Sequence, residues 1–360
     1  MNITVITENE FSLSKNVWNE LLRNSSNNEF FLTWEWTFTW WQVYGKGKEL
    51  FAIFIRDEQE NVIGIAPLYI INRAIFFIGT GENIAPEYLN LIIKKGSEES
   101  VIKQLLGYLK QKEMRWSVAY FSDIAENHLL IGLILTRTKN DNLPAYRSYT
   151  GTPCVYLPLP KETGILWEQL SSKFRYNLKW SRKKIQEIPE NKVKLFLDEA
   201  LPVSVMDNIF GLHNKRMEDK GGCGKFKSDS YKQFHTKLLE RIPNYTAIGL
   251  LESSEKPVAM IYCYHYNNKI YFYQSGFDPD SNLKKYSPVQ LLLSYMIEKA
   301  ISLGCSEFDF LRGEEDYKHR WSNLLRKKEE IAIFNTSNLC GRLFHLKHKS
   351  KSLVKTILRK

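Results

Sequence analysis

The sequence predicts an α/β (α+β) protein of two domains, each built from a mixed, mostly antiparallel sheet flanked by helices. The chain has 360 residues and 43% of them are hydrophobic, which is enough for two cores of ordinary size. Strand-like and helix-like segments follow one another in a similar order in both halves. Prolines gather within residues 140–161 and indicate a stiff crossing between the halves. We therefore expect domains at 1–150 and 151–336, followed by a basic tail at 337–360.

In the first half, apolar and β-branched runs separated by turn residues predict an antiparallel meander, and 3.6-residue periodicity predicts the helices around it. The strands are expected at residues 3–6, 50–56, 62–70, 74–78, 88–93 and 116–121, and the helices at residues 14–23, 33–44, 101–110 and 127–136.

The second half shows a similar pattern. Its strands are expected at residues 154–157, 193–197, 246–251, 258–266, 269–275, 307–311 and 330–334, and its helices at residues 164–188, 202–218 and 230–241. A further helix is marked at both ends, since Ser287 and Gln290 fit a Ser-x-x-Gln capping box, Pro288 fits the first helical position and Gly304 fits the end.

The start of this marked helix is also a candidate anion site. The first turn of a helix offers backbone N–H groups without helical partners and the positive end of the helix dipole. Lys284 and Lys285 come shortly before that turn. The sequence therefore predicts that a phosphate binds there.

Composition argues against several other classes of protein. The apolar runs are shorter than the roughly 20 residues of a membrane-spanning helix, and the N-terminus lacks the basic and apolar segments of a secretion signal. We expect a cytoplasmic location, with peripheral membrane contact left open. The five cysteines are scattered without a C-x-x-C pair, which argues against a disulfide framework and a zinc site, so no metal is expected. The formal net charge of +10 indicates an acidic partner.

Several motifs resemble the GNAT superfamily of acyltransferases, and more narrowly its cellulose-biosynthesis-type acetyltransferase branch. They lie at residues 277–279, 286–288, 308–313 and 315–321, with further similarity at residues 30–36, 40–41 and 175–178. The resemblance covers nearly the whole chain. It implies tandem GNAT-like domains, of which the second binds the acyl donor, and a relation to Fem-type transferases, which use aminoacyl-tRNA. One departure is that residues 284–289 stand where GNAT enzymes carry a glycine-rich pyrophosphate turn.

The resemblance implies acetyl-CoA or another acyl-CoA as the co-substrate. Such a donor needs an anion site for its pyrophosphate and a strand edge along which its pantetheine can lie. Gly276 is expected to allow a bulge and close approach of the donor, and backbone N–H groups there would stabilise the oxyanion. The expected donor-binding residues are Gln274, Ser275, Gly276, Phe277, Lys284, Lys285, Tyr286, Ser287, Pro288 and Val289.

The acceptor is expected to be a small-molecule or saccharide amine, which must lose a proton to attack the donor. Glu315, Glu314 and Asp309 are the candidate bases, with Glu315 ranked first, and Tyr317 is the candidate acid for the leaving thiolate. Orienting Arg312 is an equal alternative for Asp309. The expected acceptor-binding residues are Arg312, Lys318, Trp321, His213, Arg216 and Trp36.

Several of these residues also fit a purely structural interpretation. Glu314 and Glu315 suit a solvated loop, and His213, a single histidine without an evident partner in the sequence, suits packing better than catalysis. The tryptophans within residues 34–41 suit a core.

Two basic segments leave their partners open. One helix face collects Arg175, Lys179, Arg182 and Lys183, which suits a solvated surface, a tRNA or a coenzyme phosphate. The tail suits either a basic amphipathic helix that contacts a membrane or partner, or a frayed end.

We therefore expect an N-acyltransferase that moves an acyl group, foremost acetyl, from acyl-CoA to an amine by direct attack, without a metal or a covalent enzyme intermediate. The alternatives are an aminoacyl-tRNA-dependent Fem-type transferase and a catalytically inactive GNAT-fold binding module. The salt dependence of donor binding distinguishes the two donors. Binding of tRNA neutralises many phosphates, so it weakens steeply as the salt concentration rises. DNA is not an expected partner.

Overall fold

The computed structural model describes residues 1–81, 84, 86–111, 116–219, 221–222 and 224–357, with side chains up to residue 349. The chain divides into two compact units. Unit 1 comprises Met1–Gly151 and Lys327–Lys360, and unit 2 comprises Thr152–Arg326. The segment after Arg326, which the sequence assigned partly to the second domain and partly to a separate tail, therefore clusters with unit 1.

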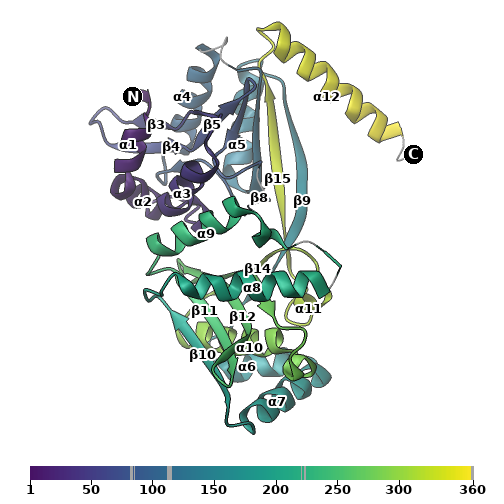
Figure 1. The fold of residues 1–360 in the computed structure, drawn as a ribbon. Coiled ribbons are helices and arrows are strands. Elements are labelled where there is room, and N and C mark those ends of the chain that lie inside the picture. Colours follow the sequence, from purple (N-terminus) through teal and green to yellow (C-terminus); the bar gives the residue numbers. More distant parts are fainter. Residues whose placement is uncertain (82–83, 85, 112–115, 220, 223, 358–360) are drawn as a thin grey trace. The chain divides into compact units, whose positions relative to one another are not determined.

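Unit 1 contains two sheets and the helices packed on them (Figure 1). Its strands are β1 Asn2–Val5, β2 Glu49–Leu50, β3 Ile53–Arg56, β4 Val62–Ala66, β5 Leu68–Ile71, β6 Ala74–Phe77, β7 Ile92–Ile93, β8 Val118–Ala125 and β15 Leu325–Phe334. Its helices are α1 Glu8–Leu13, α2 Lys15–Arg23, η1 Phe30–Leu32, α3 Trp34–Tyr44, α4 Glu98–Gln111, α5 Leu129–Asn140 and α12 Leu339–Ile357. The strand orders are β1-β3-β4-β7 and β15-β8-β6-β5-β2, and β6 pairs with β8 in parallel.

The aromatic helix α3 is almost wholly buried in unit 1. Thr33 caps its first turn, since the Thr33 side chain accepts a hydrogen bond from the backbone N–H of Trp36 at 3.3 Å. The Trp36 ring is fully buried and packs edge-to-face on Phe31 and Phe30 at 4.8 and 5.7 Å between ring centres. Burial of these large rings, as expected for a core, is what holds α3 in place.

Unit 2 contains one mixed sheet with the strand order β10-β11-β12-β13-β14-β9. Its strands are β9 Ala145–Pro158, which starts in unit 1, β10 Asn191–Leu197, β11 Thr246–Ser253, β12 Lys256–Tyr266, β13 Lys269–Phe277 and β14 Glu307–Arg312. Its helices are α6 Thr163–Gln169, α7 Ser172–Gln186, α8 Ser204–Asp219, η2 Lys225–Lys227, α9 Asp229–Arg241, η3 Asn282–Tyr286, α10 Pro288–Ser302 and α11 Asp316–His319. Neighbouring strands are antiparallel apart from β13 and β14, which are parallel.

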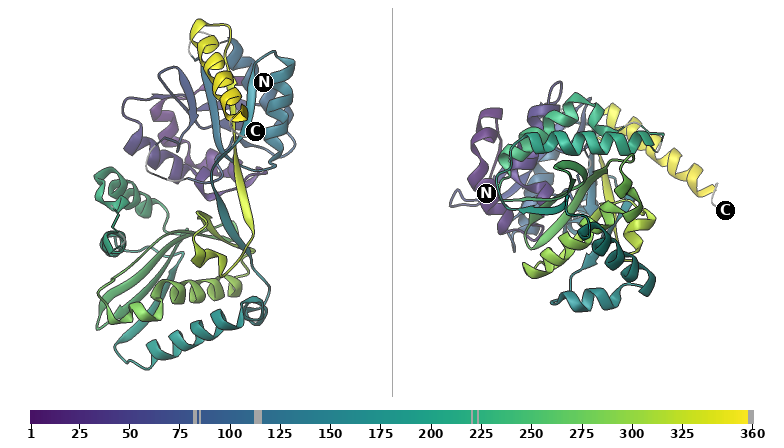
Figure 2. Two further views of the ribbon diagram at one scale, coloured as in Figure 1. Left: turned by 90° about the vertical axis from the view of Figure 1, so that its right-hand side faces the viewer. Right: turned by 60° about the horizontal axis from the view of Figure 1, so that its bottom comes forward.

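Helices cover both faces of the unit 2 sheet (Figure 2, left). α8 and α9 lie over one face, and α10, with α6 and α7 beside it, lies over the other. The apolar core beneath α10 joins residues of β11 to β14 to Phe174, Leu178 and Ile185 of α7. The prediction of an α/β fold with mixed, mostly antiparallel sheets and flanking helices is confirmed.

Two predicted segments differ from the structure. The helix expected at 164–188 is broken into α6 and α7, because Leu170 adopts an extended conformation after α6. Ser171 then caps α7 by accepting a hydrogen bond from the backbone N–H of Phe174 at 3.3 Å. The strands β9 and β15 begin earlier than expected, since both include polar, partly exposed residues that carry no apolar pattern. Each passes through the boundary between the units.

The marked helix α10 starts and ends where the sequence places it, but without the predicted capping box. Pro288 occupies the first position and Gly304, at φ +74°, follows the end. Ser287 adopts a left-handed conformation at φ +50° and its side chain makes no capping hydrogen bond. The Gln290 side chain accepts a hydrogen bond from Trp321 Nε1 at 2.8 Å instead, so the capping-box prediction was wrong. A contact 31 residues away along the chain competes for this side chain.

None of the helices in the described part of the chain combines the length and apolar character needed to cross a membrane.

Candidate active site

The two central strands of unit 2 pair briefly and then separate. β13 pairs with β14 over Lys269–Tyr271 and Glu307–Asp309, and within the described residues this parallel ladder ends there, while the strands continue to Phe277 and Arg312. On its other edge β13 pairs with β12, and the register steps from Tyr262–Gln274 to Cys263–Phe272. Tyr273 is therefore an inserted residue, which defines a β-bulge. The sheet therefore has an opening between its central strands beyond Tyr271 and Asp309, with a bulge beside it.

The bulge lies three residues before the position expected from the sequence. Gly276 serves a different close approach, because a Cβ atom there would collide with the backbone of Leu212 and His213 in α8. The glycine therefore lets helix α8 lie directly on β13, and its predicted contact with the donor stays a prediction. The prediction of a bulge at Gly276 was wrong, since the helix overhead was invisible in the sequence.

Close packing of α8 brings two of its polar side chains onto β13. His213 Nδ1 lies 3.1 Å from the carbonyl oxygen of Ser275, and Arg216 Nη1 donates to Ser275 Oγ at 2.6 Å. A carbonyl oxygen can only accept, so His213 Nδ1 is the donor of this hydrogen bond. Arg216 Nε is buried and has no hydrogen-bond partner among the residues that the structure describes. His213 and Arg216, expected to bind the acceptor, and Ser275, expected to bind the donor, therefore meet at one point.

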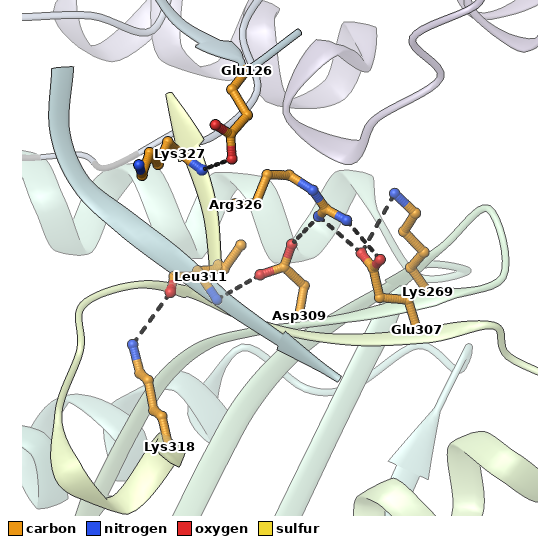
Figure 3. Close-up of polar contacts among 8 residues, drawn as sticks. All are labelled: Glu126, Lys269, Glu307, Asp309, Leu311, Lys318, Arg326 and Lys327. Atoms are coloured by element: carbon orange, nitrogen blue, oxygen red, sulfur yellow. Dashed lines mark hydrogen bonds and ion pairs between the residues drawn. The ribbon is translucent and has the colours of Figure 1, made fainter. Parts of the chain in front are cut away.

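The end of β14 and the turn after it are held in a strained shape by two buried charges, Asp309 and Lys318 (Figure 3). Leu311 has a φ of +55°, and its backbone N–H donates to Asp309 Oδ1 at 2.7 Å. Lys318 Nζ donates to the carbonyl oxygen of Arg312 at 2.7 Å, with those of Leu311 and Gly313 at 3.4 and 3.3 Å. A left-handed leucine needs this support, and such strain tends to occur at functional sites.

Asp309 is also part of a partly buried ion cluster that the sequence analysis did not find. Arg326 Nη1 lies 3.2 Å from Asp309 Oδ2, and its Nη2 donates to Glu307 Oε2 at 2.7 Å (Figure 3). Lys269 Nζ lies 3.6 Å from Glu307. Burial would raise the pKa of Glu307, but hydrogen bonds and charge from Arg326 and Lys269 outweigh it and lower that pKa. With both Asp309 oxygens engaged, its placement supports a positioning role more than that of a base.

Glu315 and Tyr317 follow this loop and lie beside the separated strands. Glu315 is exposed and pairs with Lys318 at 3.0 Å. The Tyr317 ring packs edge-to-face on Phe272, the first residue of β13 beyond the parallel ladder, at 6.5 Å. Burial, followed by the charge of Glu315, raises the pKa of Tyr317, while Arg216 acts in the opposite direction. The charges on α8 and on the 315–317 segment therefore act on the same phenol.

The turn that leads into α10 is basic and partly aromatic. Lys284 and Lys285 are exposed, and Lys284 Nζ lies 3.4 Å from Asp219 at the end of α8. Lys285 Nζ lies 5.2 Å from the ring centre of Tyr286, which packs on Trp180 of α7 at 5.3 Å. This turn, together with α7, therefore presents cations and rings beside the first turn of α10.

The basic face predicted for α7 is only partly a free surface. Arg182 contacts α10, donating to Ser294 Oγ at 2.8 Å and pairing with Glu298 at 2.9 Å. Arg175 Nη1 donates to the carbonyl oxygen of Trp167 at 2.9 Å. These two arginines hold α7 in place, which leaves Lys179 and Lys183 as the exposed cations of the predicted stripe.

The remaining predicted site residues are spread over several environments. Trp321 is buried and packs on Phe174 at 5.0 Å, and Trp36 lies in the unit 1 core, so the structure places both rings in cores. Arg312 is half-buried at the end of β14, and Glu314 is exposed. Gln274, Phe277, Tyr286 and Val289 are half-buried, Pro288 is buried and Ser287 is exposed. Their roles stay predictions.

The described residues contain no group of three or more His, Cys, Asp or Glu side chains arranged to hold a metal ion.

Comparison with known families agrees with this geometry. Residues 172–319, from the start of α7 to the end of α11, match the family model described as "Acetyltransferase (GNAT) domain". This stretch has the sequence pattern of a GNAT domain. It contains β13, α10, β14 and the loop with Glu315, which are the elements of the candidate site. No curated protein matches the chain. The narrower cellulose-biosynthesis branch stays a prediction.

Solved structures resemble the chain over nearly its whole length. FemX is 11% identical and covers 96% of this chain and 99% of its own, with a TM-score of 0.64. A conserved protein of unknown function from Bacteroides thetaiotaomicron is 9% identical, with coverage of 93% and 99% and a TM-score of 0.58. L-PGS from Bacillus licheniformis is 10% identical, with coverage of 90% and 93% and a TM-score of 0.55. At these identities the similarity shows the fold alone, which is a fold of the FemX kind.

Proposed function

We propose that the protein is an N-acyltransferase that moves an acyl group from acyl-CoA to an amine by direct attack, with acetyl as the first candidate. The main support is the opening between β13 and β14, which begins after Tyr271 and Asp309. The basic turn before α10 lies in the same domain. A strand edge and an anion site together are what a thioester of coenzyme A requires. The match of residues 172–319 to a GNAT acetyltransferase domain supports the same chemistry.

The donor is proposed to bind along β13 and at the start of α10. Its pantetheine would lie beside Gln274–Phe277, beyond the end of the parallel ladder, where the thioester carbonyl can accept from backbone N–H groups. Its pyrophosphate would lie at residues 284–289, which stand in place of the glycine-rich turn. The exposed Lys284 and Lys285 would bind it through their positive charge. The rings of Tyr286 and Trp180 offer the adenine a surface on which to stack.

Glu315 is proposed as the base that removes the proton from the amine. Glu315 is exposed, so an acceptor can reach it. Its ion pair with Lys318, with 3.0 Å between Oε2 and Nζ, holds the carboxylate in position. Tyr317 is proposed to give its proton to the leaving thiolate. The phenol is protonated at neutral pH, as an ordinary tyrosine is, and burial and the charge of Glu315 raise its pKa further. Arg216, with a buried Nε that lacks a partner among the described residues, is proposed to bind an oxygen of the acceptor.

The exposed carboxylates make the first test. Glu315→Gln should lower turnover about 100-fold, because it removes the proton acceptor but not the shape of the side chain. Glu314→Gln is the matched control, since Glu314 is the exposed neighbour on the same loop. Release of free thiol from acetyl-CoA is measured with a panel of amines as acceptors. Equal rates for the two variants would show that Glu315 is not the base, and an absence of thiol release by the wild type would favour the inactive binding module.

A second donor, aminoacyl-tRNA, is favoured by one observation. Helix α7 exposes Tyr176 and Trp180 at 68% and 40%, next to the exposed Lys173, Lys179 and Lys183. Rings interleaved with cations can stack and neutralise single-stranded nucleic acid. The similarity to FemX in fold is compatible with this donor. Binding of aminoacylated tRNA that weakens by about 10³-fold or more between 50 and 200 mM salt would support it.

A further inference from the structure

The C-terminal helix α12 has two opposite faces, of which one is packed on unit 1. Gly341 is buried against this unit, where a Cβ atom would collide with the carbonyl oxygen of Asn335. His345 Nε2 lies 2.7 Å from the hydroxyl of Tyr146, and the ring of His348 lies 4.7 Å from the Tyr146 ring. These three residues recur at helical spacing and form the inner face. Helix α12 is therefore an attached element at least as far as His348.

The outer face of α12 is apolar. Leu339, Leu343 and Leu346 recur at i, i+4 and i+7 and are exposed at 72%, 57% and 62%. The sequence continues the same spacing with Leu353 and Ile357. Single exposed leucines are ordinary on a protein surface, but a row of them along one helix face indicates a contact.

Cations flank this apolar row. Arg342 and Lys349 lie along one side of it and Lys347 along the other, and all three are exposed. The first turn of α12 carries no acidic residue, and the sequence of residues 339–360 contains no aspartate or glutamate. An apolar groove alone would match the leucines but not the cations, whereas a surface that is apolar beneath and negative above matches both features. Anionic lipid has this arrangement, because acyl chains underlie its charged headgroups.

We propose that the outer face of α12, defined by Leu339, Leu343 and Leu346 with Arg342, Lys347 and Lys349, binds the surface of an anionic lipid membrane. The leucines enter the boundary between headgroups and acyl chains, and the basic side chains reach the phosphates beside them. Contact with the membrane holds unit 1 at the lipid surface through α12. The proposal is independent of the donor and acceptor of the candidate site.

Vesicle flotation with the full chain tests this proposal. We expect binding to vesicles of phosphatidylglycerol and phosphatidylcholine, weaker binding as salt rises, and little binding to phosphatidylcholine alone. Leu343→Gln with Leu346→Gln should weaken binding to the anionic vesicles at least about tenfold. Leu13→Gln with Leu129→Gln is the matched control, since both leucines are exposed in unit 1 away from α12, at 76% and 57%.

Three results would overturn the proposal. The first is no binding to anionic vesicles, and the second is equal loss in both double variants. The third is a concentration-dependent dimer that the α12 variant abolishes, without vesicle binding by the wild type, because the outer face would then contact a second copy of the chain. Circular dichroism of each variant checks that the fold is retained.

Discussion

Replacing Tyr317 with phenylalanine should lower the rate of acyl transfer about 100-fold, with the affinity for acetyl-CoA unchanged. The substitution keeps the ring that packs on Phe272 at 6.5 Å and removes only the hydroxyl. This hydroxyl is protonated at neutral pH, and burial and the charge of Glu315 raise its pKa further. Its position beside Phe272 suits it to give that proton to the leaving thiolate. Without it, the thiolate must leave unprotonated or take a proton from water.

The control for this variant is Tyr295→Phe. Tyr295 is also partly buried with a raised pKa, and its hydroxyl contacts Gln186 at 3.2 Å on the α7 side of α10. Removal of the Tyr295 hydroxyl should leave kcat within about twofold, because this hydroxyl lies away from the candidate site. Steady-state rates and donor titrations of both variants give the comparison. A Tyr317→Phe variant with normal kcat would remove the phenol from the mechanism.

Replacing Arg326 with methionine should cost about 3 to 5 kcal/mol of the free energy of unfolding. Arg326 lies between Glu307 and Asp309, and Asp309 is fully buried. Methionine keeps much of the length of the side chain but leaves both carboxylates without the guanidinium. Because the Asp309 carboxylate also accepts from the backbone of Leu311, the site loop should loosen together with the sheet.

The loss of unfolding free energy in Arg326→Met should become smaller as pH falls. The pKa of Glu307 is lowered in the folded protein, so its pairing stabilises the protein above the pKa of the unfolded chain and is lost as pH falls. In the variant the uncompensated carboxylates become protonated more readily. The difference in unfolding free energy should therefore shrink from pH 7 toward pH 4. Urea unfolding at both pH values, with exposed Arg23→Met as the control, measures it. A difference that grows toward acid would contradict this explanation.

The sequence predicted the parts of unit 2 that depend on local signals. Pro288 and Gly304 delimit α10 because each acts through its own backbone conformation. The predicted role of Gln290 was wrong because its partner, Trp321, lies 31 residues away. The bulge was misplaced for a similar reason, since Gly276 is explained by the approach of α8, which no neighbour in the sequence announces.

The sequence identified several residues of the candidate site, but not the hydrogen bonds and ion pairs that join them. His213, Arg216 and Ser275 were each singled out, and the structure joins them by hydrogen bonds. The ion cluster of Arg326, Glu307 and Lys269 was missed, because charged residues so far apart in sequence look like ordinary surface charge until the sheet pairs them. Arg182 is the opposite case. The sequence pattern placed it in a basic binding face, but the structure pairs it with Ser294 and Glu298.

The most direct measurement is an isothermal titration of the protein with acetyl-CoA. The proposed donor site predicts saturable binding at micromolar to millimolar concentration. Lys284→Gln with Lys285→Gln should weaken this binding about tenfold or more, because charge-assisted contacts to the pyrophosphate are lost. Replacing exposed Lys46 and Lys256 by glutamine should leave it unchanged. Heat of mixing without saturation at millimolar acetyl-CoA would contradict the assignment of an acyl-CoA donor to the opening between β13 and β14.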